Sequence, residues 1–375
     1  MSLSRRTTLL GLGAFALSAC ASTTVPTRNI SGGLPADLRP SPNAAYDAWV
    51  ARFRSRAASQ GISQSTLDAA FRGTGYLPGV VRRDRNQTEF TRTLEDYLSI
   101  AASDERVSKG RAAYARHRST LNAVEARYGV PANIVTAIWG LESFYGERRG
   151  DVPVISATST LAFDGRRGAF FEKQLIEALR ILQSGDVTPA NLKGSWAGAM
   201  GHTQFIPTSY QAFAVDFTGD GKRDIWSDDP SDSLASTAAY LSRNGWQSGI
   251  SWGREAVGGA LQPQPGGPRF QVTRNFRVIK TYNNSDNYAI GVGHLADRIA
   301  GGGPLQGGFP PDRFGLTKED RIALQERLTA RGFDTGGVDG VLGTKSRAAI
   351  RAYQTRQGLP ATGDPSIALL RSLGG

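Results

Sequence analysis

The sequence predicts a mainly α-helical fold in two domains, and three observations support this prediction. Apolar residues recur at helical spacing through much of residues 46–145. A glycine-rich run at 301–308 has the composition of a linker. Three short helical patterns follow it, at 317–330, at 344–357 and after Asp364, and they predict a small three-helix bundle. A chain of 375 residues is long enough for two or three domains.

The individual helices follow from periodicity and from end signals. Residues 46–60 place Trp49, Val50 and Phe53 on one face, as in an amphipathic helix. In the last bundle, Thr317 is expected to cap the first helix, and Asp364 to cap the third with Pro365 at its first position. Further helices are predicted at 63–71, 88–101, 104–128, 170–184 and 233–244.

Residues 131–145 form an apolar segment with one acid, Glu142, near its end. A proline at the first turn and apolar residues at near-helical spacing predict a buried helix. Flanking aromatic residues such as Trp139 would partly desolvate the carboxyl group, which disfavours its charged form and raises its pKa. A carboxyl group protonated near neutral pH can serve as a general acid. From spacing alone, a structural ion pair with Arg148 or Arg149 is the alternative.

Three segments carry a family resemblance. Residues 138–146, IWGLESFYG, are similar to the catalytic-helix motif of the membrane-bound lytic murein transglycosylase B family. Residues 195–207, SWAGAMGHTQFIP, and 281–292, TYNNSDNYAIGV, resemble two further segments of that family. The resemblance implies an α+β, lysozyme-like catalytic domain over residues 43–300, with Glu142 as its catalytic acid.

The resemblance also implies residues that line a saccharide cleft. Small residues around Gly198 allow close approach of a sugar ring, while neighbouring side chains offer hydrogen bonds and apolar faces. Helix packing is the alternative for the small residues, and a core position is the alternative for the tyrosines. The substrate contacts carried over from the family are Ser195, Gln204, Phe205, Tyr240, Tyr282, Asn283 and Tyr288.

Residues 216–226, DFTGDGKRDIW, resemble the start of an EF-hand calcium loop. The expected ligands are Asp216, Thr218, Asp220 and the carbonyl of Lys222. The family resemblance implies that a later aspartate closes the loop, and Asp232 is the expected residue. The match is partial, because Thr218 replaces an acid or amide and a serine stands where the bidentate glutamate belongs. The alternatives for loop closure are Asp224, Asp228 and Asp229.

An Asp-Gly-rich turn that binds no ion is the other interpretation of this loop. Any Ca²⁺ held there would be structural, and the chemistry itself is expected to need no cofactor. With three histidines in the chain and no paired spacing, a zinc site is not expected.

The amino terminus has the features of an export signal. Residues 1–19 combine Arg5 and Arg6 with a short apolar run, and the only cysteine, Cys20, follows. This pattern resembles a bacterial lipoprotein signal, so residues 20–42 are expected to form a lipidated tether. The expected location is the periplasm of a Gram-negative bacterium, with the anchor in the outer membrane. The arginine pair leaves the choice between the general and the twin-arginine export routes open.

The carboxy-terminal residues 316–375, which follow a linker at 301–315, resemble the common peptidoglycan-binding domain. The resemblance lies in residues 324–328, 332–333, 338–343 and 349–354. A generic interaction bundle is the alternative. The formal net charge of +11 does not predict a nucleic-acid partner, because no dense basic block or aromatic-basic interleaving accompanies it.

Together, the family resemblances imply a lytic transglycosylase that acts on peptidoglycan glycan strands. The enzyme would cleave the β-1,4 bond between N-acetylmuramic acid and N-acetylglucosamine and leave 1,6-anhydromuramic acid ends. A muramidase that uses Glu142 with Asp151 or Asp164 is one alternative, because ordinary glycoside hydrolysis needs two carboxylates. A non-catalytic lipoprotein that tethers the wall is another. The cell-wall synthesis machinery is an expected protein partner.

Overall fold

The computed structural model describes residues 33–86 and 92–374. The predicted signal peptide, Cys20 and the first part of the tether lie outside these residues. The described part of the chain is mainly helical with a few short strands, which confirms the predicted fold class. None of its helices is both long and apolar enough to cross a membrane.

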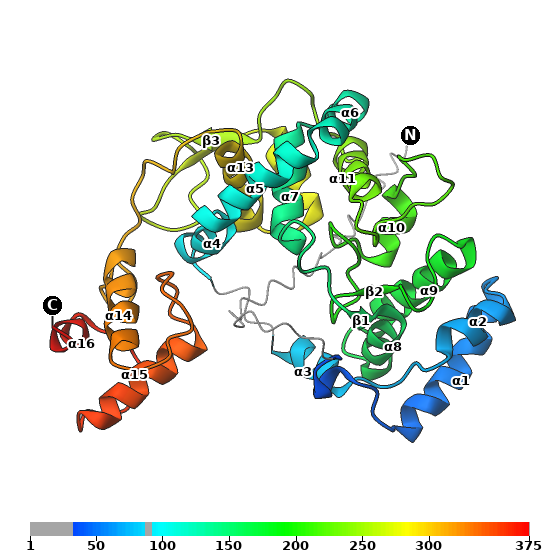
Figure 1. The fold of residues 1–375 in the computed structure, drawn as a ribbon, viewed down its shortest axis with the longest axis horizontal. Helices are drawn as coiled ribbons and strands as arrows, with labels where there is room; N and C mark the ends of the chain where they lie inside the picture. The colour runs from blue at the N-terminus through cyan, green and yellow to red at the C-terminus, as the bar shows by residue number, and fades with distance from the viewer. Residues whose placement is uncertain (1–32, 87–91, 375) are drawn as a thin grey trace, which may run out of the picture.

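The first half of the described chain is a succession of helices (Figure 1). These are η1 (Ala36–Leu38), α1 (Ala44–Ser59), α2 (Gln64–Phe71), α3 (Pro78–Arg85), α4 (Leu94–Ala101), α5 (Asp104–Arg116), α6 (Arg118–Tyr128) and α7 (Ala132–Ser143). The prediction of one helix over 104–128 was wrong, because the chain leaves helical geometry at His117, between α5 and α6.

The second half contains the remaining helices and all four strands of the described chain. They are β1 (Val152–Pro153), α8 (Val154–Asp164), α9 (Gly168–Ser184), β2 (Lys193–Gly194), α10 (Pro207–Phe213), α11 (Ser231–Arg243), β3 (Gly253–Glu255), β4 (Phe270–Val272), α12 (Arg274–Tyr282), α13 (Asp286–Ile299), α14 (Lys318–Ala330), α15 (Thr344–Arg356) and α16 (Ile367–Ser372). The strands form two antiparallel pairs, β1 with β2 and β3 with β4.

Most residues of helix α7 belong to the larger hydrophobic core, and Figure 1 shows this helix among α5, α6, α11 and α13. All of its residues except Asn133 are buried, and it packs against α5, α6, α11 and α13. A helix that is apolar on every side is stable only when other elements surround it. The core therefore fixes the position of the helix end that carries Glu142.

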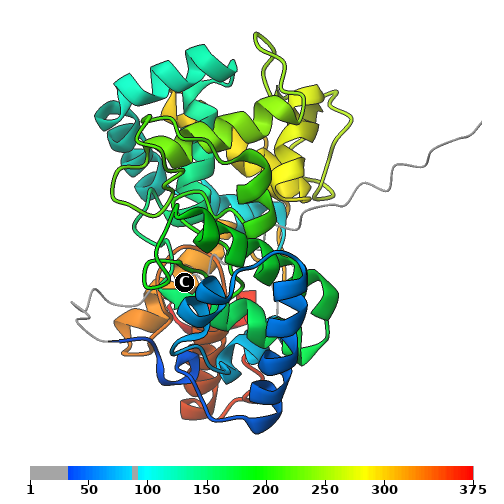
Figure 2. The ribbon, with the colours of Figure 1, turned by 90° about the vertical axis from the view of Figure 1, so that its right-hand side faces the viewer.

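A second group of helices packs at the other end of the catalytic region. Helices α8 and α9 pack on each other, and α1, α2 and α3 lie against them. In Figure 2 the blue helices of the amino-terminal part lie at one end of the molecule, and the yellow helices of residues 274–299 lie at the other. The loop after α7 and the pair β1–β2 connect the two groups.

The helix ends test the predicted caps. In α14 the Thr317 side chain accepts from the Asp320 N–H and the Asp320 carboxylate accepts from the Thr317 N–H, which confirms Thr317 as the cap. The prediction that Asp364 caps the third helix was wrong, because Ser366 accepts from the Leu369 N–H and caps α16. The Asp364 carboxylate instead pairs with Arg347 at 2.9 Å.

The residues from 316 onward, here called the C-terminal module, have a hydrophobic core of their own. Leu324, Leu328, Ile350 and Tyr353 belong to it. The segment 301–315 before it lies against the preceding domain, because Leu305 and Phe309 pack on the larger core.

Helix α13 approaches its neighbours closely at Gly293, so Gly293→Ala should destabilise the fold. An added Cβ would overlap the indole ring of Trp252, whose Nε1–H is held by Asp297 Oδ2 at 3.0 Å. Overpacking costs about 1–3 kcal/mol, more than the roughly 1 kcal/mol that alanine adds in helix propensity. Chemical denaturation of both proteins measures the difference. Gly258→Ala, where the added Cβ meets open space, is the control and should change stability little.

Candidate active site

Glu142 lies in the last turn of α7 and is 7% exposed. Tyr288, in the first turn of α13, donates its O–H to Glu142 Oε1 at 2.7 Å. The two residues are 146 positions apart in sequence, so the packing of α13 on α7 brings them together. Burial and the charge of Glu142 raise the pKa of the Tyr288 hydroxyl well above its usual value. The tyrosine therefore stays neutral and remains a hydrogen-bond donor to the carboxyl group.

The chain turns sharply directly after Glu142. Phe144, Tyr145 and Gly146 all have left-handed backbone conformations, with φ of 54°, 60° and 89°. Such conformations cost free energy for residues other than glycine and need support from their surroundings. The Tyr145 hydroxyl donates to the Arg106 carbonyl at 2.7 Å, and Ser143 Oγ accepts from the Gly146 N–H at 2.9 Å. These contacts hold the turn that ends the helix beside Glu142.

Four of the predicted cleft residues form one aromatic cluster at Glu142. Tyr282 stacks on Tyr288 with ring centroids 6.5 Å apart and planes 9° apart. Tyr240 and Phe205 pack on Tyr282 at 4.9 and 5.9 Å. The hydroxyls of Tyr282 and Tyr240 donate to backbone carbonyls of Thr203 and Thr281, at 2.6 and 2.5 Å. The structure therefore brings these side chains together and satisfies their polar ends.

The other predicted contacts occupy the surrounding loops. Ser195 Oγ accepts from the N–H groups of Ala197 and Ala199, at 3.3 and 3.1 Å. Gln204 donates through Nε2 to the carbonyls of Arg149 and Gly201, at 2.9 and 2.8 Å. Ser195 thus braces its own loop, and Gln204 also joins that loop to the one that follows α7.

Asn283 is half-buried and caps the carboxyl end of α12. It comes directly after Tyr282, which belongs to the aromatic cluster at Glu142. Asn283 is therefore adjacent in sequence to a member of the aromatic cluster.

His202 is buried and has a structural role that the sequence analysis did not predict. The Trp139 indole N–H donates to its Nδ1 at 3.1 Å, and its Nε2–H donates to the Ser227 carbonyl at 2.7 Å. Burial lowers the pKa of the His202 imidazole to about 4, so the ring is neutral at neutral pH. The histidine joins α7 to the loop that follows the EF-hand-like segment.

The arginines that could have paired with Glu142 have other partners. Arg149 pairs with Asp228 at 2.7 Å and donates to the carbonyls of Trp226 and Ser227. The Arg148 guanidinium lies over the Phe144 ring, 4.6 Å from its centroid. Neither arrangement matches the ion pair with Glu142 that spacing allowed.

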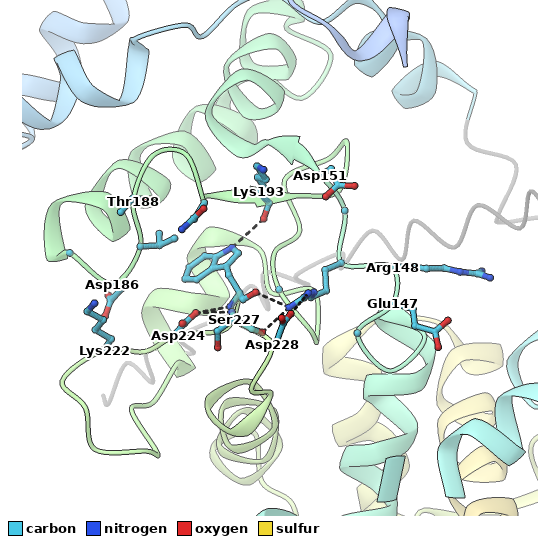
Figure 3. Close-up of a pocket in the computed structure, with 18 residues that line it drawn as sticks. Glu147, Arg148, Asp151, Asp186, Thr188, Lys193, Lys222, Asp224, Ser227 and Asp228 are labelled. Atoms are coloured by element: carbon cyan, nitrogen blue, oxygen red, sulfur yellow. Dashed lines mark hydrogen bonds and ion pairs between the residues drawn. The ribbon is translucent and has the colours of Figure 1, made fainter. Parts of the chain in front are cut away.

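The two candidate second carboxylates also lie in separate surroundings. Asp164 pairs with Arg85 at 2.6 Å, and its side chain is 9% exposed. Asp151 is exposed and lines a cavity of about 730 Å³, shown in Figure 3 with Asp186 and Lys222 on its opposite side. Glu142 is not among the residues that line this cavity, which lies against the loop after α7.

The EF-hand-like segment gathers three carboxylates. Oxygens of Asp216, Asp220 and Asp232 all lie within 4.8 Å of one another. Burial raises the pKa of the Asp232 carboxyl, and the charge of Asp216 contributes to the shift. Three like charges at this separation repel one another, so the donor set fits a hard divalent cation with oxygen ligands.

The other proposed ligands of this segment surround the three carboxylates. Thr218 Oγ1 lies 3.4 Å from Asp216 Oδ1, and the Lys222 N–H donates to Asp220 Oδ1 at 2.9 Å. Of the alternatives for closing the loop, Asp228 pairs with Arg149, and Asp224 and Asp229 accept hydrogen bonds from nearby N–H groups. Asp232 is therefore the later aspartate that the structure places beside Asp216 and Asp220.

The neutral state of His202 predicts acid destabilisation. The folded-state pKa of about 4 lies below the usual 6.5, so the unfolded chain binds more protons between these values. The contribution of neutral His202 to the free energy of unfolding is therefore fully present above about pH 6.5, and it is lost as the pH drops towards 4. At pH 4.5 the protonation of His202 on unfolding lowers the free energy of unfolding by about 2–3 kcal/mol. Urea unfolding at pH 7.5 and 4.5 measures the loss, which should be smaller in His202→Asn. Equal losses in the two proteins would contradict the assignment.

Two family models match the chain. The transglycosylase SLT domain matches residues 45–261 and 256–297, which together make up more than half of the chain. A peptidoglycan binding domain matches residues 317–373.

Curated relatives agree with these matches. Membrane-bound lytic murein transglycosylase B of Escherichia coli K12 is 31% identical over 242 residues, covering 54% of this chain and 66% of the relative. The spore cortex-lytic enzyme of Bacillus cereus is 49% identical over 49 residues, covering 13% of this chain and 19% of that protein.

Solved structures agree as well. SltB3 of Pseudomonas aeruginosa, in complex with NAG-anhNAM-pentapeptide, is 44% identical in sequence to this chain and has a TM-score of 0.69. The match covers 89% of this chain and 100% of the SltB3 chain. SltB1 of the same organism is 32% identical and has a TM-score of 0.60, and the match covers 67% of this chain and 98% of the SltB1 chain. The Escherichia coli lytic transglycosylase Slt35 in complex with calcium is 26% identical, with coverages of 69% and 93% and a TM-score of 0.58.

These matches confirm the resemblance drawn from the three sequence segments and from the carboxy-terminal residues. The chain belongs to the transglycosylase SLT domain family of lytic murein transglycosylases and carries a peptidoglycan-binding domain after its catalytic domain.

Proposed function

We propose that the protein is a lytic transglycosylase that cleaves the β-1,4 bond between N-acetylmuramic acid and N-acetylglucosamine in peptidoglycan. The observation that carries the proposal is the buried Glu142 carboxyl at the end of α7, held by the neutral Tyr288 hydroxyl. A single oriented carboxyl group in apolar surroundings can first donate and then accept a proton. The proposed site contacts are Ser195, Gln204, Phe205, Tyr240, Tyr282, Asn283 and Tyr288.

In the proposed reaction, Glu142 protonates the glycosidic oxygen as the bond to C1 of N-acetylmuramic acid breaks. The resulting carboxylate then takes the proton of the muramoyl 6-hydroxyl as that oxygen bonds to C1. Glu142 regains its proton, and the product is a 1,6-anhydromuramic acid end. The substrate's own acetamido group would stabilise positive charge at C1 between the two steps, so one protein carboxyl group is sufficient.

The muramidase alternative requires a second carboxylate near the same bond. Glycosidases that use two carboxylates place them about 5–9.5 Å apart. Asp164 is paired with Arg85, and Asp151 faces a cavity whose lining does not include Glu142. These positions favour the transglycosylase, whose chemistry needs no second acid.

Replacement of Glu142 with Gln should lower the release of anhydromuropeptides by at least about 100-fold, because an amide cannot transfer the proton. The substitution is nearly isosteric and keeps an oxygen to accept from Tyr288. Mass spectrometry of fragments released from purified peptidoglycan measures the effect.

The matched control for this experiment is Glu147→Gln. Glu147 is an exposed carboxylate on the loop after α7 and pairs with Lys109. This variant should retain activity. Full activity of Glu142→Gln would refute the assigned role, and products heavier by one water would identify a muramidase.

We propose that the EF-hand-like loop holds a structural Ca²⁺ through Asp216, Thr218, Asp220, the carbonyl of Lys222, and Asp232. The proximity of the three carboxylates supports this proposal. The ion would neutralise the repulsion among them and stabilise the fold. It would take no part in the proton transfers.

Calcium should raise the unfolding temperature of the protein, and chelation should lower it. At a Ca²⁺ concentration 100 times the dissociation constant, binding to the folded state contributes about 2.7 kcal/mol. Differential scanning fluorimetry with and without Ca²⁺ measures the shift. Asp232→Asn should abolish most of the shift, whereas Asp229→Asn should retain it. An identical unfolding temperature with and without Ca²⁺ would exclude the site.

The cellular location is proposed on the sequence. Cys20 would carry a lipid anchor in the outer membrane, with the catalytic domain in the periplasm. The Escherichia coli relative is named for lytic action on murein, which is consistent with a periplasmic location. The peptidoglycan-binding domain would hold the enzyme on glycan strands, and the cell-wall synthesis machinery is a proposed partner.

A further inference from the structure

We propose that a buried ion pair between Arg321 and Glu95 holds the C-terminal module on the catalytic domain, and thereby sets where along a glycan strand the enzyme cuts. Glu95 belongs to α4, and Arg321 belongs to α14. Figure 1 shows α14 next to α4. The inference rests on the proposed function, because it assumes that the module binds the strand that Glu142 cleaves.

Arg321 is positioned by its own module. Its side chain is 4% exposed, although arginine is almost never fully buried unless it is paired. Nε donates to the Gly340 carbonyl at 2.7 Å, and Nη1 donates to the Leu316 carbonyl at 3.2 Å. These two bonds fix the plane of the guanidinium group. Nη2 then donates to Glu95 Oε2 at 2.5 Å, across the interface between the two domains.

Glu95 is equally enclosed on the catalytic side. Its side chain is 10% exposed, and its backbone N–H donates to Gln264 Oε1 at 3.0 Å. Two further carboxylates approach the guanidinium group, Asp96 at 3.6 Å and Asp312 at 3.7 Å. Removing one member of such a pair leaves the other charge buried without its partner. The pair therefore favours the docked arrangement of the two domains.

The segment between the domains provides a second, independent attachment. Glu255 is the last residue of β3, and both of its carboxylate oxygens accept hydrogen bonds from the backbone of this segment. Oε2 accepts from the Gln306 N–H at 2.7 Å, and Oε1 accepts from the Gly307 N–H at 2.6 Å. Leu305 and Phe309 pack against the larger core a few residues away. A segment attached in this way does not act as a flexible tether, despite its glycine-rich composition.

The two attachments make the domains one rigid unit. The distance between the point where the C-terminal module holds a glycan strand and the point where Glu142 cleaves that strand is then constant. The position of cleavage is therefore set relative to the point at which the strand is held. If the module moved freely, cleavage would occur over a wider range of positions and the released fragments would vary more in length.

The experiment compares the chain from residue 21 onward with its Glu95→Ala variant. The control is Glu105→Ala, which removes an exposed carboxylate from the neighbouring helix α5. Small-angle X-ray scattering and limited proteolysis within residues 301–315 report docking. Chromatography of fragments released from insoluble peptidoglycan reports the length distribution, and turnover of a short soluble glycan reports the catalytic site.

For Glu95→Ala we expect a larger radius of gyration, at least tenfold faster proteolysis of the segment and a broader length distribution. Turnover of the soluble glycan should be unchanged, and Glu105→Ala should behave as the parent protein. Arg321→Met should reproduce the Glu95→Ala result from the other side of the interface.

Two outcomes would overturn the proposal. One is an unchanged radius of gyration, proteolysis rate and fragment distribution in both Glu95→Ala and Arg321→Met. The other is an equal loss of activity on soluble and insoluble substrates, which would mean that the pair only supports the catalytic fold. If the parent protein releases no anhydro sugars, the proposed function fails, while scattering and proteolysis still decide whether the pair docks the module.

Discussion

The active site depends on the burial of a carboxyl group at the end of a helix that is itself inside the core. Packing on four neighbouring helices places α7, and this packing carries Glu142 into apolar surroundings. A buried carboxyl group needs a hydrogen-bond partner, and Tyr288 of α13 supplies it. The same burial keeps the tyrosine neutral. Helix packing therefore determines both the position of the acid and the protonation state of its partner.

Other polar groups near Glu142 also have hydrogen-bond or ion-pair partners. Arg149 connects the loop after α7 with the Ser227 backbone, and His202 connects Trp139 of α7 with the same backbone. His202 is neutral because of its burial, and Arg149 is neutralised by Asp228. The bonds of His202 and Arg149 connect the acid-bearing helix and the loop after it with the loop next to the carboxylate cluster. The left-handed turn between them is held separately, by the bonds of Tyr145 to Arg106 and of Gly146 to Ser143.

A buried charge also organises the relation between the two domains. Arg321 is almost completely enclosed, so its guanidinium group requires the Glu95 carboxylate from the catalytic side. The three clustered carboxylates around Asp232 present the opposite case, because they lack a cationic partner within the cluster and fit a cation from solution. In both places, the requirement to neutralise charge explains the arrangement better than local sequence preference does.

The sequence by itself determined the features that depend on near neighbours. These include the apolar helix around Glu142, the Thr317 cap, the closely spaced aspartates at 216 and 220, and the family motifs. Tertiary structure alone decided the long-range pairs, such as Tyr288 with Glu142 and Arg85 with Asp164. Helix α8 was not predicted because nearly all of it is buried, so it has no amphipathic pattern. Local signals act over one or two helical turns, whereas a buried polar group takes whichever partner the packed helices bring to it.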